Sequence, residues 1–371
     1  MTSPRLADLT TAAVGGPARH YVRAETERAV VDAVAGADAA GRPVLLVGGG
    51  SNLIAADAGF GGTVVHVATR GVRTLAEDAD GVLLEVQAGH PWDELVARVV
   101  ADGLAGIEAL SGIPGTTGAT PVQNVGAYGQ EVAQTIELVR AWDRREGRVR
   151  TFSPEELEFS YRDSALKRGT VDGSPRHVVL AVRFRLCRGA DSAPVRYGEL
   201  ARRLGVEVGG RAPLGRVRDT VLALRAGKGM VLDPADRDTY STGSFFTNPI
   251  LPADGLGGRV PAEAPRFPVV DVAGRPLADR VKLSAAWLID HAGFAKGFGL
   301  PGTRNELLGL DGAAVAGGRA ALSTKHTLAL TNRGGASAED LMALARTVRD
   351  GVAAVYGVEL VAEPVIVGTS V

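Results

Sequence analysis

The most unusual stretch of the sequence is residues 111–129, which read SGIPGTTGATPVQNVGAYG. Five glycines and many small or hydroxyl-bearing residues lie among these 19 positions, so the segment is too long and irregular for a simple hairpin. A floppy surface loop is one interpretation, but three interspersed apolar residues favour an ordered segment. A backbone that must lie flat against a large planar ligand would need this composition, and Gln123, Asn124 and Tyr128 can supply oriented hydrogen bonds.

A second glycine-rich turn lies upstream, where Gly48-Gly49-Gly50-Ser51-Asn52 follows the apolar run PVLLV at residues 43–47. The apolar run predicts a buried strand that enters a turn. Glycines permit positive φ and leave no Cβ to block a phosphate. Consecutive backbone N–H groups in such a turn form an anion-binding nest. An ordinary turn after a strand is the alternative interpretation.

Composition narrows the class of protein. The chain has 371 residues, of which 45% are hydrophobic and 22% charged, as expected for a folded protein of two or three structural units. Its formal net charge of −1 argues against a general nucleic-acid or anionic-membrane binder. No run of 18 apolar residues is present, and residues 1–16 lack an apolar stretch of signal-peptide length. We therefore expect a cytoplasmic protein that does not span a membrane.

Several common functional motifs are missing from the sequence. It contains no GxGxxG after a strand, no GxxxxGK[ST], no HExxH and no GxSxG. The six histidines show no ligand spacing and the single cysteine excludes a CxxC pair, so no metal site is expected. Cys187 lies in an alternating, strand-like segment, which favours a structural thiol over a nucleophile.

Hydrophobic periodicity gives the expected elements. Helical spacing predicts helices over residues 25–40, 91–102, 214–224, 283–291 and 337–356. Strand patterns cover residues 43–47, 63–67, 82–87, 136–142, 178–186, 327–331 and 359–367, whereas the glycine- and proline-rich residues 251–276 are predicted to form a loop. New structural units are expected to begin near residues 72 and 230.

The motifs together resemble one family, the UDP-N-acetylenolpyruvoylglucosamine reductases (MurB) of the longer-loop type. The resemblance runs in family order from about residue 9 to residue 368. It is carried by GGGSN at 48–52, SGIPG at 111–115, QNVGAYG at 123–129, FSYRDS at 159–164, GSFFTNP at 243–249, KLSAAWLID at 282–290 and AEP at 362–364.

This resemblance implies the fold class α+β, with a p-cresol methylhydroxylase/vanillyl-alcohol oxidase-type FAD-binding fold and a C-terminal α/β substrate-binding domain. The expected domains are residues 1–71, joined by the C-terminal strand 363–371, then 72–229 for the second FAD-binding subdomain and 230–362 for substrate. It also implies noncovalent FAD, NADPH as electron donor and UDP-N-acetylglucosamine enolpyruvate as the small-molecule substrate, in peptidoglycan precursor synthesis. A monomer without nucleic-acid or membrane partners is expected.

The resemblance also assigns residues to the site. Cofactor contacts are expected at Gly48, Gly49, Gly50, Ser51, Asn52, Ser111, Gly112, Ile113, Pro114, Gly115, Thr116, Gly118, Ala119, Gln123, Asn124, Gly126, Ala127, Tyr128 and Arg225. Substrate contacts are expected at Tyr161, Tyr197, Lys228 and Asn248, and catalytic roles at Arg162, Ser244 and Glu363.

The three catalytic candidates suit the family reaction, in which an enolpyruvyl ether becomes a lactyl ether. Negative charge develops as an enediolate, so the site needs a cation, and a guanidinium such as Arg162 holds a carboxylate bidentately. Ser244 is the candidate proton donor, and Glu363 lies in an apolar stretch, where a carboxylate is costly unless it is paired or protonated. Taken alone, the three residues also fit a surface ion pair, a turn serine and a solvent-facing carboxylate.

One departure from the family concerns the mobile loop that closes over the substrate phosphates. Its tyrosine between two prolines is replaced by Phe267 in the sequence Pro265-Arg266-Phe267-Pro268. Phenylalanine cannot hydrogen-bond a phosphate, and Arg266 is a candidate replacement.

Two alternatives stay open. Either the chain is another FAD-dependent oxidoreductase of the same fold, which need not keep Ser244 and Glu363 together, or it is a non-catalytic UDP-sugar- or flavin-binding protein, which would not need all three chemical residues.

Overall fold

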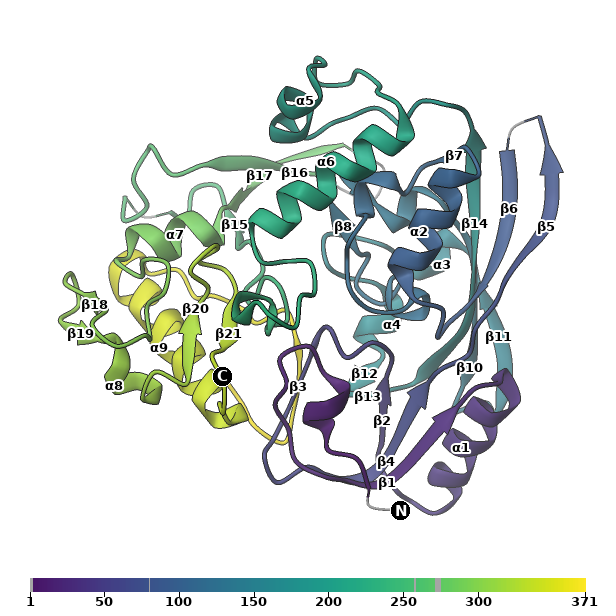
Figure 1. Cartoon of the computed structure of the whole chain (residues 1–371), viewed down its shortest axis with the longest axis horizontal. Helices are drawn as coiled ribbons and strands as arrows, with labels where there is room; N and C mark the ends of the chain where they lie inside the picture. Colours follow the sequence, from purple (N-terminus) through teal and green to yellow (C-terminus); the bar gives the residue numbers. More distant parts are fainter. Residues whose placement is uncertain (1–2, 80, 257, 271–274) are drawn as a thin grey trace. The chain divides into compact units, whose positions relative to one another are not determined.

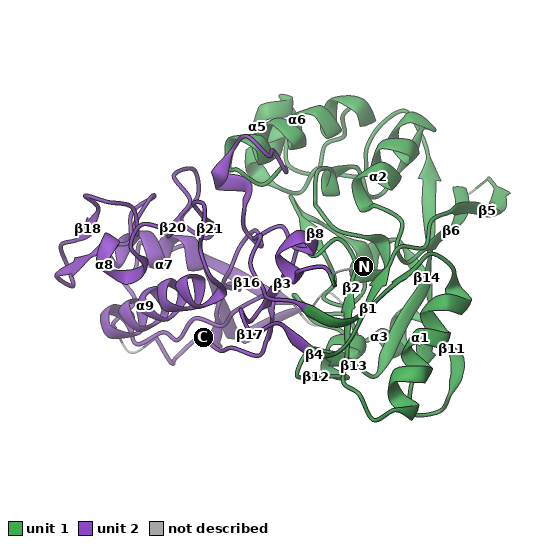
Figure 2. Cartoon of the chain, turned by 60° about the horizontal axis from the view of Figure 1, so that its bottom comes forward, with its two compact units in different colours: residues 1–3, 18–50, 61–231 green, residues 4–17, 51–60, 232–371 purple. Residues whose placement is uncertain are grey.

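The computed structural model describes residues 3–79, 81–256, 258–270 and 275–371. The chain divides into two compact units, which Figure 2 shows in different colours. Unit 1 is formed chiefly by residues 18–50 and 61–231, and unit 2 by residues 4–17, 51–60 and 232–371. Both units mix helices with strands.

Unit 1 contains a small sheet in the order β1-β4-β2, formed by Ala18–Ala24, Phe60–Val67 and Val44–Val47. Strands β2 and β4 are parallel, with Val44 opposite Thr63. Helix α1 (Glu27–Ala39) lies beside this sheet (Figure 1). The Thr26 hydroxyl caps the helix by accepting a hydrogen bond from the Ala29 N–H at 3.1 Å. The predicted helix and both predicted strands of this region are thus confirmed.

A larger antiparallel sheet forms the centre of unit 1. Its order is β11-β10-β14-β6-β5, with β7 paired to β14. On one face, Trp92 of helix α2 packs against Phe184 of β14 with ring centroids 5.9 Å apart. The strands are β5 (Val72–Asp78), β6 (Gly81–Gln87), β7 (Leu104–Ala105), β10 (Ile136–Asp143), β11 (Arg148–Phe152) and β14 (His177–Arg188).

The remaining elements of unit 1 are mostly short. They are α2 (Trp92–Ala101), η2 (Glu108–Leu110), η3 (Thr117–Ala119), β8 (Gly126–Ala127), β9 (Gln130–Glu131), η4 (Val132–Gln134), α3 (Pro154–Leu157), α4 (Ala165–Arg168), β12 (Thr170–Val171), β13 (Ser174–Pro175), α5 (Gly198–Leu204) and α6 (Leu214–Gly227). The prediction that Cys187 lies on a strand is confirmed, since it pairs with Ala105 across β14 and β7, although its side chain is exposed.

Unit 2 is built around helix α9 (Ala338–Tyr356), which packs on strands β20 and β21. Ser337 and Asp340 form the capping box at its start, and Gly357 ends it with a φ of +66°. The other elements are η1 (Leu6–Leu9), β3 (Leu53–Ala55), η5 (Arg237–Thr239), β15 (Ile250–Pro252), β16 (Arg266–Val270), β17 (Pro276–Leu283), α7 (Ala285–His291), β18 (Arg304–Asn305), β19 (Leu310–Asp311), α8 (Gly312–Ala316), β20 (Ala320–Leu322), β21 (Leu330–Asn332) and β22 (Val365–Val367).

The prediction of a loop over residues 251–276 is wrong for residues 251–252, 266–270 and 276, which lie on strands, and is confirmed for residues 253–256, 258–265 and 275. Strands β15, β17 and β16 form an antiparallel sheet in that order. The prolines that suggested a loop occupy positions where a strand tolerates them, because Pro252 and Pro268 lie on the two edge strands and Pro276 is the first residue of β17. Residues 257 and 271–274 of the predicted loop lie outside the described residues.

The last strand is shorter than predicted and pairs in parallel with β3, so that Val365 lies opposite Leu53. Glu363 therefore precedes strand β22 instead of lying within it. The further division of unit 1 into two flavin-binding subdomains at residue 71 stays a prediction, which its two separate sheets support.

Candidate active site

The two glycine-rich loops of unit 1 touch through their backbones. A Cβ atom added to Gly49 would lie 2.7 Å from the Cα of Gly115, and one added to Gly48 would lie 2.3 Å from the Thr116 hydroxyl oxygen. Because real Cβ atoms do not approach other atoms so closely, glycine is required at Gly49, where the opposing atoms are backbone. The sequence predicted the two loops separately, and the structure brings Gly48 and Gly49 against Gly115 and Thr116 in one close contact, the glycine cradle.

A carboxylate that the sequence analysis missed anchors the second loop. Asp93, in the first turn of α2, accepts a hydrogen bond from the Gly112 N–H at 2.6 Å and two from Arg218 at 2.7 and 2.8 Å. Burial opposes ionisation of the Asp93 carboxyl, but the hydrogen bonds from Arg218 and Gly112 outweigh it and lower its pKa. Asp93 therefore stays ionised near neutral pH and holds the loop at a glycine with a φ of +70°.

Arg225 fits the predicted cofactor contact. Its side chain is only 8% exposed, and burial lowers the pKa of its guanidinium. One guanidinium nitrogen donates to the Met230 carbonyl at 2.8 Å, whereas the buried Nε has no hydrogen-bond partner among the described residues. A Cβ added to Gly112 would lie 3.4 Å from this Nε, so the donor lies beside the second loop. An unsatisfied buried donor is costly, and an acceptor oxygen of a bound cofactor would satisfy it.

Arg162 reaches the end of the same loop. Its Nη2 donates to the Gly126 carbonyl at 2.8 Å, and its Cζ lies 5.5 Å from the centre of the Tyr161 ring. The backbone of Arg162 has a φ of +55°, a left-handed conformation that costs free energy in a residue other than glycine. Asn124 of the loop also has a positive φ, +44°, and donates to the Ser160 carbonyl at 3.1 Å. The predicted catalytic arginine is thus tied to predicted cofactor residues.

Two predicted substrate residues meet a predicted cofactor residue in unit 1. The rings of Tyr128 and Tyr197 lie edge to face with centroids 5.4 Å apart, and the Lys228 ammonium lies 5.9 Å from the centre of the Tyr128 ring. Glu199, which the sequence analysis missed, pairs with Lys228 at 3.1 Å. Burial opposes the charge on Lys228, but the contacts with Glu199 and the tyrosines outweigh it and raise the lysine pKa.

In unit 2, Ser244 and Glu363 lie on neighbouring extended segments. The Glu363 N–H donates to the Phe245 carbonyl at 2.8 Å, and Phe246 pairs with Ala362. The Phe245 N–H in turn donates to the Leu328 carbonyl at 2.8 Å, so the segment that carries Ser244 is held on both sides. The structure therefore brings together two of the three catalytic candidates.

The predicted cofactor residue Asn52 lies beside Glu363 in the same unit. The Asn52 side-chain amide nitrogen donates to the Glu363 backbone carbonyl at 3.4 Å, and the Asn52 backbone carbonyl accepts from the Val365 N–H at 2.9 Å. Asn248, predicted to contact substrate, uses its side-chain oxygen to accept from the Ala285 N–H at 2.9 Å at the start of α7. The Asn248 side chain therefore satisfies one of the free backbone N–H groups at the start of α7.

The segment around Phe267 differs from the sequence-based expectation. The Arg266 guanidinium donates to the carbonyls of residues 260, 261, 262 and 264, so its hydrogen bonds are made within its own segment. The suggestion that Arg266 replaces the missing hydroxyl of the family's tyrosine is therefore not supported. Phe267 lies on β16 opposite Lys282, with 44% of its surface exposed.

The described residues contain neither a metal-binding cluster nor a membrane-spanning helix. No group of three or more His, Cys, Asp or Glu side chains within them could hold a metal ion. No helix among them is both long enough and apolar enough to cross a membrane.

Comparisons with known proteins account for this arrangement. Residues 18–153, which include both glycine-rich loops, match the model of the FAD binding domain, and residues 233–367 match that of the UDP-N-acetylenolpyruvoylglucosamine reductase C-terminal domain. The chain is 53% identical to the UDP-N-acetylenolpyruvoylglucosamine reductase of Streptomyces coelicolor, over 98% of this chain and 89% of the relative. It is 55% identical to that of Nocardia farcinica, over 98% and 88% of the two chains.

The chain belongs to the UDP-N-acetylenolpyruvoylglucosamine reductase family. A solved structure agrees: the MurB crystal structure from Thermus caldophilus matches 98% of this chain and 97% of its own, with a TM-score of 0.62 and 26% sequence identity. The resemblance drawn from the motifs is thus confirmed, as is the fold class of an FAD-binding domain followed by a reductase C-terminal domain. The family membership also accounts for the polar side chains of Asp93, Arg162 and Arg225 beside the glycine-rich loops, since this family has an FAD-binding domain.

Proposed function

We infer that this chain reduces UDP-N-acetylglucosamine enolpyruvate to UDP-N-acetylmuramate, with FAD as cofactor and NADPH as electron donor, in peptidoglycan precursor synthesis. The observation that carries this inference is the glycine cradle. Gly48 and Gly49 lie against Gly115 and Thr116 with no room for a Cβ, and the unsatisfied Nε of Arg225 lies beside Gly112. These features suit a large flat cofactor with exposed acceptor oxygens.

In the proposed chemistry, bound reduced FAD supplies the hydride that adds to the methylene carbon of the enolpyruvyl group. The Arg162 guanidinium stabilises the negative charge that develops on the substrate carboxylate as an enediolate. The Ser244 hydroxyl gives its proton to the carbon beside that carboxylate, and Glu363 assists in stabilising the enediolate as a neutral carboxylic acid that donates a hydrogen bond, because an ionised carboxylate would repel it. Ser244 suits this role because it is only half-buried and its hydroxyl makes no hydrogen bond to another described residue.

The remaining assignments follow the same proposal. Lys228 and Tyr197 bind the diphosphate of the substrate, Tyr161 orients Arg162, and Asn248 is a further substrate contact. The loops at residues 48–52 and 111–128 hold FAD noncovalently, since neither contains a histidine or cysteine. We further propose a cytoplasmic monomer.

The activity is tested by following NADPH oxidation in the presence and absence of UDP-N-acetylglucosamine enolpyruvate. Substrate-dependent oxidation supports the proposal, whereas a yellow protein that lacks it would indicate another flavin oxidoreductase of this fold. A colourless protein that binds the nucleotide would indicate a non-catalytic binding protein. Acid precipitation should release the flavin into the supernatant, and flavin that stays in the pellet would contradict noncovalent binding.

The role of Ser244 is tested with Ser244→Ala. We expect flavin reduction by NADPH to be nearly unchanged, because this step needs no proton donor for substrate carbon. Reoxidation of the flavin by substrate should slow by about 10²–10⁴-fold, the usual contribution of a positioned acid. Stopped-flow absorbance measures the two half-reactions separately, and equal slowing of both would exclude the assigned role.

A further inference from the structure

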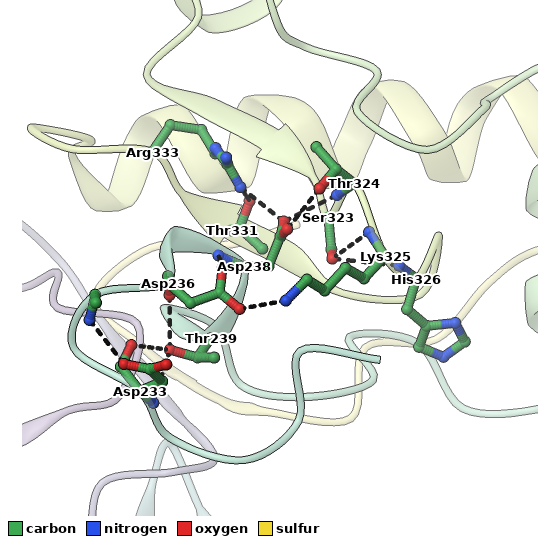
Figure 3. A network of polar contacts seen from close by, with 11 residues as sticks. Asp233, Asp236, Asp238, Thr239, Ser323, Thr324, Lys325, His326, Thr331 and Arg333 are labelled. Atoms are coloured by element: carbon green, nitrogen blue, oxygen red, sulfur yellow. Dashed lines mark hydrogen bonds and ion pairs between the residues drawn. The ribbon is translucent and has the colours of Figure 1, made fainter. Parts of the chain in front are cut away.

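A buried carboxylate in unit 2 forms the centre of a polar network that no step above uses. Figure 3 shows Asp238 of η5 pointing toward Thr324 and Arg333. Its carboxylate accepts hydrogen bonds from the Thr324 N–H at 2.9 Å, the Thr324 hydroxyl at 2.5 Å and the Arg333 guanidinium at 2.7 Å. Asp238 is 3% exposed whereas its partner Thr324 is exposed, so the carboxylate itself is shielded from water and its donors less so.

The backbone segment that begins at Asp238 continues to Ser244. Beyond Asp238, the Tyr240 carbonyl accepts from the Asn332 N–H at 2.9 Å, and the Phe245 N–H donates to the Leu328 carbonyl at 2.8 Å. Residues 238–245 therefore run along residues 324–333, which contain strand β21. Asp238 ties the beginning of this pairing to both ends of that segment, because Thr324 lies at one end and Arg333 at the other.

The chain just before Ser244 is also fixed. The Ser241 hydroxyl accepts from the Gly243 N–H at 3.1 Å, the Ser241 carbonyl accepts from the Thr11 hydroxyl at 2.6 Å, and Gly243 has a φ of +74°. Because these hydrogen bonds restrain the segment, a small change in the backbone at Asp238 would be transmitted along it toward Ser244. The direction of the Ser244 hydroxyl depends on this segment.

We propose that Asp238 is a positioning residue for the proton donor, whose carboxylate aligns residues 238–245 on residues 324–333 and so sets the direction of the Ser244 hydroxyl. The proposal rests on the proposed role of Ser244. A carboxylate is needed because two oxygens must accept from three donors, one of them charged. An asparagine offers one oxygen and turns an amide group toward Thr324 or Arg333.

The charge state of Asp238 supports this assignment. Burial opposes its ionisation, but the hydrogen bonds from Thr324 and the charge of Arg333 outweigh it and lower its pKa. The other charged groups that face this network are Asp236, which pairs with Lys325 at 2.6 Å, and Asp233. The Asp236–Lys325 pair is more exposed, with 25% and 38% of the side chains accessible, so it contributes less to alignment.

The test compares Asp238→Asn with a matched control, Asp340→Asn. Asp340 also pairs with an arginine, Arg319, at 2.7 Å and accepts a backbone N–H, from Ser337 at 2.9 Å, but it serves the start of α9. We expect Asp238→Asn to slow flavin reoxidation by substrate about 10–100-fold, the scale of a misplaced reacting group, and to leave flavin reduction by NADPH unchanged. Asp340→Asn should lower the melting temperature and change neither rate.

A double mutant separates positioning from general destabilisation. If Asp238 acts through Ser244, adding Asp238→Asn to Ser244→Ala should slow reoxidation no further, whereas independent effects would multiply. Multiplying effects, or equal slowing of both half-reactions by Asp238→Asn, would overturn the proposal. If Ser244→Ala alone does not slow reoxidation, the proposed role of Ser244 fails instead.

A second variant keeps the test valid should Asp238→Asn not fold. Thr324→Val keeps the carboxylate and removes only the hydroxyl donor. It should slow reoxidation less than Asp238→Asn is expected to, again with flavin reduction unchanged. A folded Thr324→Val protein with wild-type reoxidation would contradict the proposal.

Discussion

Asp93 in unit 1 and Asp238 in unit 2 have similar hydrogen-bond partners but hold different kinds of segment. Each carboxylate pairs with an arginine and accepts a backbone N–H, Asp93 from Gly112 and Asp238 from Thr324. The Asp93 side chain is 39% exposed, whereas that of Asp238 is 5% exposed. Asp93 holds a loop whose shape already depends on glycines, but Asp238 holds a segment shaped by hydrogen bonds. On the two proposals above, FAD binding at the glycine-rich loops depends on the absence of Cβ atoms, and the direction of the Ser244 hydroxyl depends on buried polar contacts.

The largest effect is expected from Gly49→Ala, which tests whether the glycine-rich loops depend on the absence of a Cβ atom. The new Cβ would lie 2.7 Å from the Gly115 Cα and within 3.3 Å of two further backbone atoms, so one loop must move. We expect a loss of about 1–3 kcal/mol in the free energy of unfolding and of most bound FAD. Thermal melting and the ratio of flavin to protein absorbance measure the two losses.

The control is Gly61→Ala, because a Cβ there meets nothing within 4 Å. It should retain flavin and stability. Full flavin content in Gly49→Ala would show that the contact between the loops is not needed for cofactor binding.

A smaller effect is expected from Asp93→Asn, which removes the charge that holds Gly112. Because the site is partly exposed, we expect a loss of about 1–2 kcal/mol in the free energy of unfolding at pH 7. The folded-state pKa of Asp93 is lowered, so its stabilising contribution is complete above the unfolded value of about 3.9 and is lost as the pH falls below it. The difference between wild type and variant should therefore shrink below about pH 4.

Urea unfolding at several pH values measures this difference. Glu94→Gln is the matched control, since Glu94 is the next residue of α2 and pairs at the surface with Arg70 at 3.0 Å. It should change stability little. A difference for Asp93→Asn that persists unchanged in acid would contradict the ionised state assigned to Asp93.

The smallest effect is expected from Phe267→Tyr, which tests whether residues 265–268 contact the substrate. If residues 265–268 close over the nucleotide, the added hydroxyl should tighten substrate binding by less than about 1.5–3 kcal/mol, because Phe267 is 44% exposed and water competes. Titration calorimetry of the substrate measures the gain. Phe267→Leu, which adds no hydroxyl, should not tighten binding, and unchanged affinity in both variants would remove this segment from the proposed lid.

The sequence was most informative where composition itself is the signal. The glycines at 48–50 and 111–129 indicated the glycine cradle because no other residue fits a backbone-to-backbone contact, and the helix at 337–356 was predicted from its apolar spacing. Family resemblance then supplied Ser244 and Glu363, whose neighbouring segments come from residues more than a hundred positions apart.

The remaining features needed the folded chain. Asp93 meets Arg218 and Asp238 meets Arg333 across 125 and 95 residues, so no local pattern reveals either pair. Likewise, only the ion pair with Lys228, 29 residues further along the chain, identifies Glu199 as a neighbour of the candidate site. Strand β16 was missed because Pro268 usually argues against a strand, and only the sheet order shows that β16 lies at an edge.

The parallel pairing of β3 with β22 has a consequence for how the chain is made. Leu53 emerges from the ribosome about 310 residues before its partner Val365, which corresponds to roughly 15–60 s of translation. Throughout that time Leu53, Ile54 and Ala55, which are buried in the finished protein, have no permanent neighbour strand. Asn52 and Glu363 meet only when this last strand is synthesised. A nascent chain therefore joins Asn52 to the Glu363 segment only after Val365 has been synthesised, however early its glycine loops have formed.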